Sequence, residues 1–310
     1  MNKKIKIYLN KLNENWIVDR QRQEFIENNN DIVTKLIYKS NLLWIIAPWT
    51  WKKVNKKYLE NKKVLCTIHH IDENKLNQEL SDFKDRDKFV NTYHVTNEKT
   101  ATQLEDLTKK KIVVEPFWIN SNNWKIINNK NQLREKYKIN KKTFVIGSFQ
   151  RDSEGSNLSL PKLSKGPDRL LEIVSYYSKN NDDVLVLLSG KRRDYIINEL
   201  KKLKIKYLYF EMTDLSVLNE LYNILDLYIV ASRFEGGPQS IYECALTKTP
   251  IISTDVGVAN LILSENSIFD MSNYIDAKPD IDIAHRNVQH YLIENSMKRF
   301  RTIMEDSFEN

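Results

Sequence analysis

Short apolar runs and amphipathic stretches alternate along most of the chain. The apolar runs have the length of β-strands and occupy residues 5–9, 42–47, 64–68, 89–95, 112–115, 144–149, 184–189, 207–210, 227–230 and 250–253. Helical patterns cover residues 16–27, 98–107, 133–138, 167–178, 194–203, 215–225, 240–247 and 283–308. Strands that alternate with helices predict an α/β fold with parallel, doubly wound sheets.

A polar, Asn-rich stretch at residues 121–142 separates two such series. A chain of 310 residues is long enough for two ordinary domains. We therefore predict an N-terminal domain over residues 1–120, a linker over 121–142 and a C-terminal domain over 143–285. A terminal helix over residues 286–310 completes the predicted organisation.

The two cysteines and the N-terminus indicate the compartment. Cys66 and Cys244 each lie inside an apolar element, which predicts reduced, buried thiols rather than a disulfide framework. The start MNKKIKIYLN lacks the apolar core of a signal peptide, and no apolar run is long enough to span a bilayer. We expect a soluble, cytoplasmic protein.

The net charge of +7 falls mostly in the first 120 residues, which makes an acidic partner or an anionic membrane plausible. Aromatic residues are interleaved with lysines between Lys39 and Lys63 in this region: Trp44, Trp49, Trp51 and Tyr58. Such a mixture is typical of a membrane-interface anchor, a sugar-stacking surface or a single-stranded nucleic-acid site. Core tryptophans beside a solvated lysine loop explain it equally well.

The most informative stretch is residues 226–260. An apolar strand from Asp226 is followed by Glu235-Gly236-Gly237-Pro238, a helical stretch and a second strand. Paired glycines let the backbone approach a ligand, and the N–H groups at a helix start favour an anion. Glu235 and a second carboxylate, Glu243, can both face the crevice above the strands. A nucleotide-sugar, with an anion at one end and hydroxyls at the other, fits this arrangement.

The run SRFEGGPQSIYE, followed by TPIISTDVG, resembles the donor-site signature of retaining GT-B glycosyltransferases, also called glycosyltransferase family four. The resemblance implies two Rossmann-like domains whose parallel, doubly wound sheets face each other across a cleft. It implies a nucleotide-sugar donor in the C-terminal domain, an acceptor in the N-terminal domain, and a C-terminal helix that returns to the N-terminal domain. The resemblance is specific across about residues 130–270 and looser across residues 1–120.

Residues of the C-terminal domain match the family's donor site. Arg151 and Lys165 resemble the cations that hold the donor diphosphate, with Lys162 as a rival because the loop between them is longer than usual. Glu235 resembles the residue that contacts the transferred sugar, and Glu243 the one that binds the ribose hydroxyls. The resemblance also implies donor contacts at Gly190, Gly236, Gly237, Pro238, Gln239 and Ser240.

Residues of the N-terminal domain match the family less closely. His69 and His70 end an apolar strand, and the family has a histidine near the anomeric carbon at a corresponding strand end. His69 is the favoured match and His70 the alternative, while a satisfied structural histidine would explain either. Candidate acceptor contacts are Trp16, Trp49, Trp51 and His70.

We expect no metal or other cofactor. The triplets Asp85-Arg86-Asp87 and Asp280-Ile281-Asp282 do not follow an apolar strand, as a metal-binding D-x-D motif of the other major glycosyltransferase fold would. The resemblance implies sugar transfer with retention of configuration to a glycan, lipid-linked or small-molecule acceptor. It is compatible with peripheral association at the inner face of a membrane.

Two other functions are compatible with parts of the sequence. A GT-B sugar phosphorylase shares the fold, but normally needs a pyridoxal-phosphate lysine and a larger chain. A basic module that binds nucleic acid or an anionic surface fits the charge, but leaves Glu235, Glu243, Arg151 and Lys165 without a role. We therefore expect no nucleic-acid partner.

Overall fold

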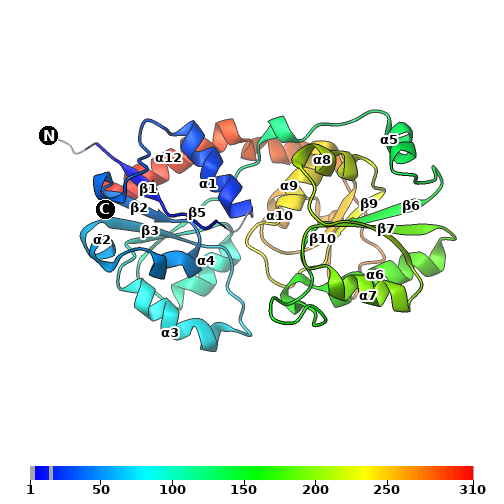
Figure 1. Ribbon diagram of the computed structural model, residues 1–310, viewed down its shortest axis with the longest axis horizontal. Helices are drawn as coiled ribbons and strands as arrows, with labels where there is room; N and C mark the ends of the chain where they lie inside the picture. The colour runs from blue at the N-terminus through cyan, green and yellow to red at the C-terminus, as the bar shows by residue number, and fades with distance from the viewer. Residues whose placement is uncertain (1–3, 14–16, 310) are drawn as a thin grey trace. The chain divides into compact units, whose positions relative to one another are not determined.

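A computed structural model describes residues 4–13 and 17–309 of the chain (Figure 1). The chain divides into two compact units. Unit 1 comprises Met1–Trp118 and Tyr291–Asn310, and unit 2 comprises Ile119–His290. Unit 1 is thus built from two separate segments of the chain, whereas unit 2 is continuous.

Unit 1 contains one parallel sheet, in which the described residues form five strands. In spatial order the strands are β1 (Ile7–Leu9), β2 (Leu42–Ile45), β3 (Lys63–Ile68), β4 (Thr92–Val95) and β5 (Lys111–Val114). The main helices are α1 (Ile17–Asn28), α2 (Lys56–Asn61), α3 (Leu76–Asp87), α4 (Glu98–Glu105) and α12 (Ile293–Glu309). Spatial order follows chain order, because each crossover places the next parallel strand beside the last.

Each face of this sheet packs against its own hydrophobic core. Side chains alternate along the strands, so Trp44 and Leu43 of β2 point to opposite faces. The face with Trp44 packs with residues of α1 and α12, including Phe25 and Phe300, whose rings lie 4.9 and 5.8 Å from that of Trp44. The face with Leu43 packs with α2, α3 and α4. The strands are therefore mostly apolar on both faces, as expected for a parallel sheet covered on both sides.

One buried histidine closes a chain of hydrogen bonds in unit 1. The Nε2–H of His94 donates to the carbonyl oxygen of Glu115 (2.8 Å), and the Thr67 hydroxyl donates to Nδ1 of His94 (3.0 Å). Trp44 Nε1 in turn donates to Thr67 Oγ1 (2.9 Å). Because a carbonyl can only accept, the network requires the neutral Nε2–H tautomer. Burial lowers the pKa of His94 to about 4.

Unit 2 contains a second parallel sheet, in which the described residues form six strands. In spatial order they are β11 (Ile268–Phe269), β10 (Ile251–Thr254), β9 (Leu227–Val230), β6 (Phe144–Ser148), β7 (Val184–Ser189) and β8 (Lys206–Phe210). The helices are α5 (Lys130–Lys136), α6 (Pro167–Asn180), α7 (Asp194–Lys202), α8 (Leu215–Asn223), α9 (Gln239–Thr247), α10 (Ala259–Ile262) and α11 (Ile281–Asn287). α6 and α7 cover one face, and α8, α9 and α10 the other (Figure 1).

The two sheets confirm the predicted doubly wound α/β fold. The structure adds four helices and strands that the sequence analysis did not predict: α2, α3, α10 and β11. α3 escaped prediction because Phe83 and Arg86 are its buried residues and the rest of its sequence is mostly polar. β11 has only two residues, which is too short for a periodic pattern.

The prediction of one helix over residues 283–308 was wrong. The structure divides this region into α11, a 3₁₀ segment (Val288–Tyr291) and α12. The division follows from two apolar stripes that pack in different units. Ala284 and Val288 are buried in unit 2, whereas Met297 and Phe300 are buried in unit 1.

Residues 121–142 pack tightly on unit 2. The Arg134 guanidinium is buried and donates to the carbonyl oxygen of Ile224 (2.8 Å) and to Asp226 Oδ2 (2.5 Å). Lys130 Nζ also contacts Asp226 (2.7 Å), and the Val145 N–H donates to the same carboxylate (2.8 Å). Asp226, the residue immediately before β9, thus links α5 to the start of β6.

Both cysteines are free and buried, which confirms the prediction of buried thiols. Burial raises the pKa of the Cys66 thiol to about 12. None of the described helices combines the length and the apolar character that a membrane crossing requires.

We predict that His94 makes unit 1 sensitive to mild acid. The unfolded chain binds a proton at this histidine near pH 6.5, whereas the folded chain does so only near pH 4. The free energy of unfolding should therefore fall as pH falls through this window, by up to about 3 kcal/mol from this group. Urea unfolding from pH 7 to pH 4 measures the slope. His94→Gln should flatten it, and the exposed His290→Gln control should not; equal slopes in both variants contradict the assignment.

Candidate active site

The carboxyl edge of the unit 2 sheet brings together loops that are distant in sequence. From β6, the chain continues to β7 and β8 on one side, while β9, β10 and β11 lie on the other. Strand order therefore switches direction between β6 and β9. In open α/β sheets the loops on either side of such a switch point enclose a ligand crevice. The loop after β6 (residues 149–166) carries Arg151 and Lys165, and the loop after β9 carries Glu235.

Lys165 and Glu235 meet at this switch point. The Lys165 ammonium forms an ion pair with Glu235 Oε1, and the two side chains are only 16% and 10% exposed. The Ser232 hydroxyl donates to the same carboxylate oxygen (3.2 Å). Gln150 Nε2 donates to the carbonyl oxygen of Lys165 (3.0 Å), which fixes the backbone of the lysine. The structure thus joins two of the four residues predicted to act in catalysis.

A glycine permits the close approach of the two loops. Gly166 has a φ of 63°, and a Cβ atom there would lie 1.9 Å from the carbonyl oxygen of Ala231. The N–H groups of Arg233 and Phe234 both donate to the carbonyl oxygen of Ser164 (2.8 and 3.2 Å). Any side chain at position 166 would force these segments apart. The predicted Lys165-Gly166 pair is therefore placed by backbone contact at the end of β9.

The Gly-Gly-Pro segment leads directly into α9. Pro238 is the N-cap, and Gln239 and Ser240 form the first turn. The backbone here lies against a second loop, because a Cβ atom on Gly257 (φ 59°) would lie 2.8 Å from the Gly236 carbonyl oxygen. This packing holds Gly236 and Gly237 at the start of a nine-residue helix, whose N–H groups and dipole favour an anion.

Glu243 is buried within an aromatic cluster. The Tyr222 hydroxyl donates to Glu243 Oε2 (2.7 Å), and the carboxylate residue is 6% exposed. The Tyr222 ring in turn packs edge-on against Phe149 (4.8 Å) and against Trp124 (5.6 Å). Burial, and then the nearby Glu243 charge, raise the pKa of Tyr222 well above its ordinary range. The sequence analysis did not identify Tyr222 as the partner of Glu243.

Gly190 follows β7 in a left-handed conformation (φ 93°). Its carbonyl oxygen accepts a hydrogen bond from the Tyr209 hydroxyl (2.9 Å), and its N–H donates to Phe210 O (3.3 Å). The neighbouring strand β8 therefore determines the path of this turn.

A buried ion pair joins the loops after β6 and β7. Arg193 Nε lies 2.6 Å from Asp152 Oδ2, and the two side chains are 0% and 2% exposed. Arg193 Nη1 also donates to the carbonyl oxygens of Ser148 (2.7 Å) and Ser189 (3.1 Å), the last residues of the two strands. The N–H of Ile196 donates to Asp152 Oδ1 (3.3 Å). Burial raises the pKa of the Asp152 carboxyl and lowers the pKa of the Arg193 guanidinium. The charge of the partner residue acts against both shifts.

This ion pair was missed in the sequence. Arg193 stands in a run of three basic residues, where a solvated side chain is the ordinary expectation. The available signal was positional: Asp152 and Arg193 both follow the carboxyl ends of apolar strands that the predicted fold makes adjacent. Because Arg151 directly precedes Asp152, the pair also fixes the backbone of a residue predicted to act in catalysis.

The predicted site residues of unit 1 separate into different environments. His69 follows β3, and its Nε2–H donates to the carbonyl oxygen of Ile46 (2.9 Å). Its ring stacks with Phe117 (5.8 Å) and lies 5.9 Å from the ring of Trp49, which is 52% exposed. His70 is exposed. Trp51 is buried, and its Nε1 donates to Asp82 (3.0 Å). Trp16 lies outside the described residues.

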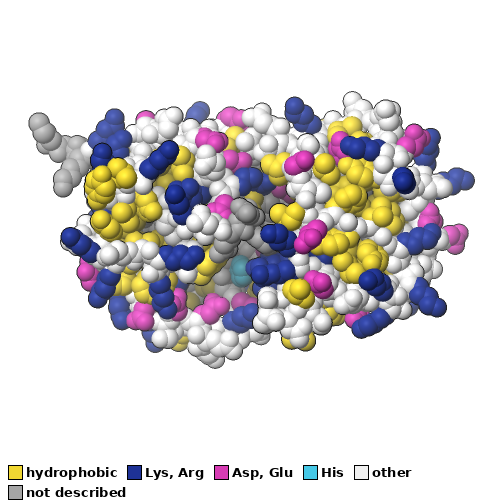
Figure 2. Space-filling view, viewed as in Figure 1, with side chains coloured by type: hydrophobic (Ala, Val, Ile, Leu, Met, Phe, Trp, Pro, Cys, Tyr) yellow, Lys and Arg dark blue, Asp and Glu magenta, His cyan; other side chains and the backbone are white. Residues whose placement is uncertain are grey.

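The structure also decides part of the interpretation of the Lys39–Lys63 segment. Trp44 and Trp51 belong to the two cores of unit 1, so neither forms a surface with the lysines. Lys52 pairs with Asp82 (2.6 Å), which further reduces the local positive charge. Figure 2 shows Lys and Arg side chains spread over the visible face of unit 1 rather than gathered in one patch.

The two D-x-D triplets have local structural contacts. Asp85 pairs with Lys88 (2.7 Å), and Asp87 accepts a hydrogen bond from Thr108 (2.8 Å). Asp280 caps α11 by accepting from the Ile283 N–H (2.9 Å). Among the described residues, no group of three His, Cys, Asp or Glu side chains is arranged to hold a metal ion.

Comparison with known proteins gives one family match. The family described as "Glycosyl transferases group 1" matches residues 129–301. No curated protein matches the chain.

Several solved structures share the fold at low sequence identity. HepE from Anabaena, solved with UDP and glucose, has a TM-score of 0.73 at 12% identity, covering 97% of this chain and 100% of its own. Sucrose-phosphate synthase from Thermosynechococcus elongatus has a TM-score of 0.68 at 14% identity, covering 88% and 75%. A glycosyltransferase from Rickettsia africae has a TM-score of 0.61 at 18% identity, covering 97% and 84%.

We predict that the Asp152–Arg193 pair is a main determinant of unit 2 stability. Arg193→Met should leave Asp152 buried without its cation and lower the free energy of unfolding by about 3–5 kcal/mol. The double variant Asp152→Leu/Arg193→Met should recover part of this loss, because no buried charge then lacks a partner. Urea unfolding of the three proteins measures the effect. A loss below about 1 kcal/mol in Arg193→Met would mean that solvent replaces the pair.

Proposed function

The chain belongs to the glycosyl transferases group 1 and has the GT-B fold, and on this basis we propose that it is a retaining glycosyltransferase. It would move a sugar from a nucleotide-sugar to a glycan, lipid-linked or small-molecule acceptor. The observation that carries the proposal is the Lys165–Glu235 ion pair at the switch point of the unit 2 sheet. A cation and a carboxylate held in contact there suit a ligand that joins a diphosphate to a sugar.

The donor would replace the internal ion pair with its own groups. The diphosphate competes with Glu235 for the Lys165 ammonium, and the Gly236–Gly237 backbone at the start of α9 provides further N–H donors. Glu235, released from the lysine, then accepts hydrogen bonds from the hydroxyls of the transferred sugar. HepE binds UDP and glucose, as its structure was solved with both, which supports a donor of this class.

Glu243 would accept hydrogen bonds from the ribose hydroxyls. The Tyr222 hydroxyl holds the carboxylate on one oxygen, so its orientation is set before the donor arrives. Pre-orientation lowers the entropy that must be lost when the ribose binds. Gly190, Pro238, Gln239 and Ser240 complete the proposed donor contacts.

Catalysis would consist of stabilising the departing nucleoside diphosphate. The bond between the anomeric carbon and the phosphate oxygen breaks, and a bond to the acceptor hydroxyl oxygen forms on the same face. The acceptor proton passes to the leaving phosphate, so no protein carboxylate has to act as a base. Arg151 and Lys165 neutralise the charge that develops on the phosphate, a role otherwise taken by a divalent metal. His69 would contact the sugar near the anomeric carbon.

The acceptor side supports a less specific proposal. The exposed Trp49 ring lies beside His69 and offers an apolar face on which a sugar could stack. A lipid-linked acceptor would be presented at a membrane, so we also propose peripheral association with an anionic bilayer.

Replacing Glu243 tests the donor assignment. UDP-glucose should raise the unfolding temperature of the native chain, because a ligand that binds only the folded state stabilises it. Glu243→Ala should weaken this shift and raise KM with nearly unchanged kcat, since ribose contacts persist into the transition state. Tyr222→Phe, which keeps the carboxylate, is the matched control and should have a smaller effect. Loss of kcat with unchanged donor affinity would refute the ribose role.

Chelation and Arg151 replacement test the metal-free mechanism. Turnover should survive EDTA, and Arg151→Ala should lower kcat roughly 10²- to 10³-fold, the scale for removing one group that stabilises transition-state charge. Lys179→Ala, at the far end of α6, removes an exposed cation remote from the carboxyl edge and should leave turnover unchanged. Activity that EDTA abolishes and Mn²⁺ restores would instead indicate a metal-dependent enzyme.

A further inference from the structure

The loop between β6 and α6 carries three leucines at the protein surface. Leu158, Leu160 and Leu163 expose 42%, 52% and 51% of their surfaces. We call residues 158–163 the leucine loop. Single exposed apolar side chains are ordinary, whereas this loop carries three exposed leucines within six residues, a local density of apolar side chains that favours an interaction site.

The leucine loop is held in a defined conformation. Ser153 and Pro161 form an antiparallel bridge, and the N–H of Lys162 donates to the carbonyl oxygen of Asp152 (2.7 Å). The base of the loop is therefore tied to the buried Asp152–Arg193 pair. The leucines project from an ordered hairpin, so little conformational entropy would be lost when they bind a partner.

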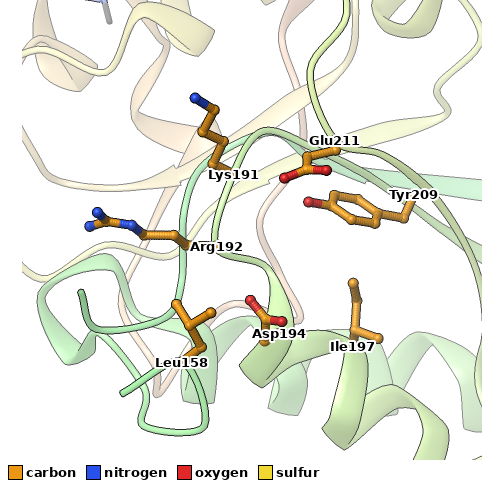
Figure 3. Close-up of a pocket in the computed structure, with 7 residues that line it drawn as sticks. All are labelled: Leu158, Lys191, Arg192, Asp194, Ile197, Tyr209 and Glu211. Carbon is orange, nitrogen blue, oxygen red and sulfur yellow. The ribbon is translucent and has the colours of Figure 1, made fainter. Parts of the chain in front are cut away.

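Basic side chains lie beside the leucines. Leu158 lines a pocket of about 320 Å³ together with Lys191, Arg192, Asp194, Ile197, Tyr209 and Glu211 (Figure 3). Lys191 and Arg192 are exposed, and in Figure 3 their charged ends point away from Glu211. Arg192 also reaches the loop itself, since a Cβ atom on Gly155 would lie 3.0 Å from its Nη1. Lys162 adds a cation within the loop.

Exposed leucines beside cations suit the interface of an anionic bilayer, where negatively charged headgroups border apolar acyl chains. Apolar side chains gain free energy by entering the boundary between headgroups and acyl chains. Lysine and arginine beside them gain from anionic headgroups, and their long stems allow the charge to remain at the polar surface.

We propose that the leucine loop docks unit 2 on an anionic lipid bilayer. Leu158, Leu160 and Leu163 would enter the interface, and Lys191 and Arg192 would contact the headgroups. Lys165 lies two residues after the leucine loop, so docking would bring the carboxyl edge of the unit 2 sheet to the membrane surface. Vesicle binding does not depend on the proposed sugar transfer and can be measured without any substrate.

Co-sedimentation of the full chain with vesicles tests the proposal. The probes are vesicles of phosphatidylcholine alone and vesicles with about one-third phosphatidylglycerol. The native chain should bind the anionic vesicles, less strongly at high salt, and not the neutral ones. Leu158→Ser/Leu160→Ser/Leu163→Ser should weaken binding at least about tenfold.

Matched variants separate this surface from others. Leu203→Ser/Leu261→Ser/Ile275→Ser removes three exposed apolar residues elsewhere on unit 2, which are 49%, 42% and 54% exposed, and should bind like the native chain. Unchanged unfolding temperatures show that both triple variants are folded. Native-like binding by the leucine-loop variant overturns the proposal, as does absence of binding by the native chain. Loss of binding only when Lys52, Lys53, Lys56 and Lys57 become Glu would assign membrane contact to unit 1 instead.

Discussion

The candidate site depends on one buried ion pair. Parallel strands end at a common edge, but the loops that leave them have no hydrogen-bond ladder to hold them together. In unit 2 the Asp152–Arg193 pair supplies that connection, because the arginine also binds the last carbonyl groups of β6 and β7. Both charges are removed from solvent, so each would be a costly unpaired buried charge without the other. Arg151, Gly190 and the leucine loop are all anchored within a few residues of this pair.

The opposite side of the crevice is fixed by close backbone contact instead of charge. Gly166 lies against Ala231, and the Ser164 carbonyl oxygen accepts from two successive N–H groups of the loop after β9. This contact makes the position of Lys165 insensitive to its own side-chain conformation. In the proposed donor complex, the lysine would therefore exchange Glu235 for the diphosphate without a change in the backbone.

The sequence predicted the features that depend on local pattern. Every strand except the two-residue β11 follows from an apolar run. The Glu235-Gly236-Gly237 segment predicts a donor site, because paired glycines beside a carboxylate, between two strands, are typical of a ligand-binding turn. Features that depend on tertiary partners were not accessible. Trp51 and Arg193 stand beside basic residues in the sequence, yet both are buried. Each also bonds to a carboxylate that is distant in sequence, Asp82 for Trp51 and Asp152 for Arg193. The break before α12 likewise depends on which core each apolar stripe joins.

The discontinuous make-up of unit 1 has a consequence for biosynthesis. Unit 2 is one uninterrupted segment, so all of its strands and helices have been synthesised before α12 is made. The aromatic core around Trp44 needs Phe300 and Met304 from α12, which are synthesised only after the whole of unit 2. Domains generally fold as units during synthesis. Unit 2 would thus fold ahead of unit 1, and the N-terminal sheet would keep one apolar face only partly covered, by α1, until α12 has been synthesised.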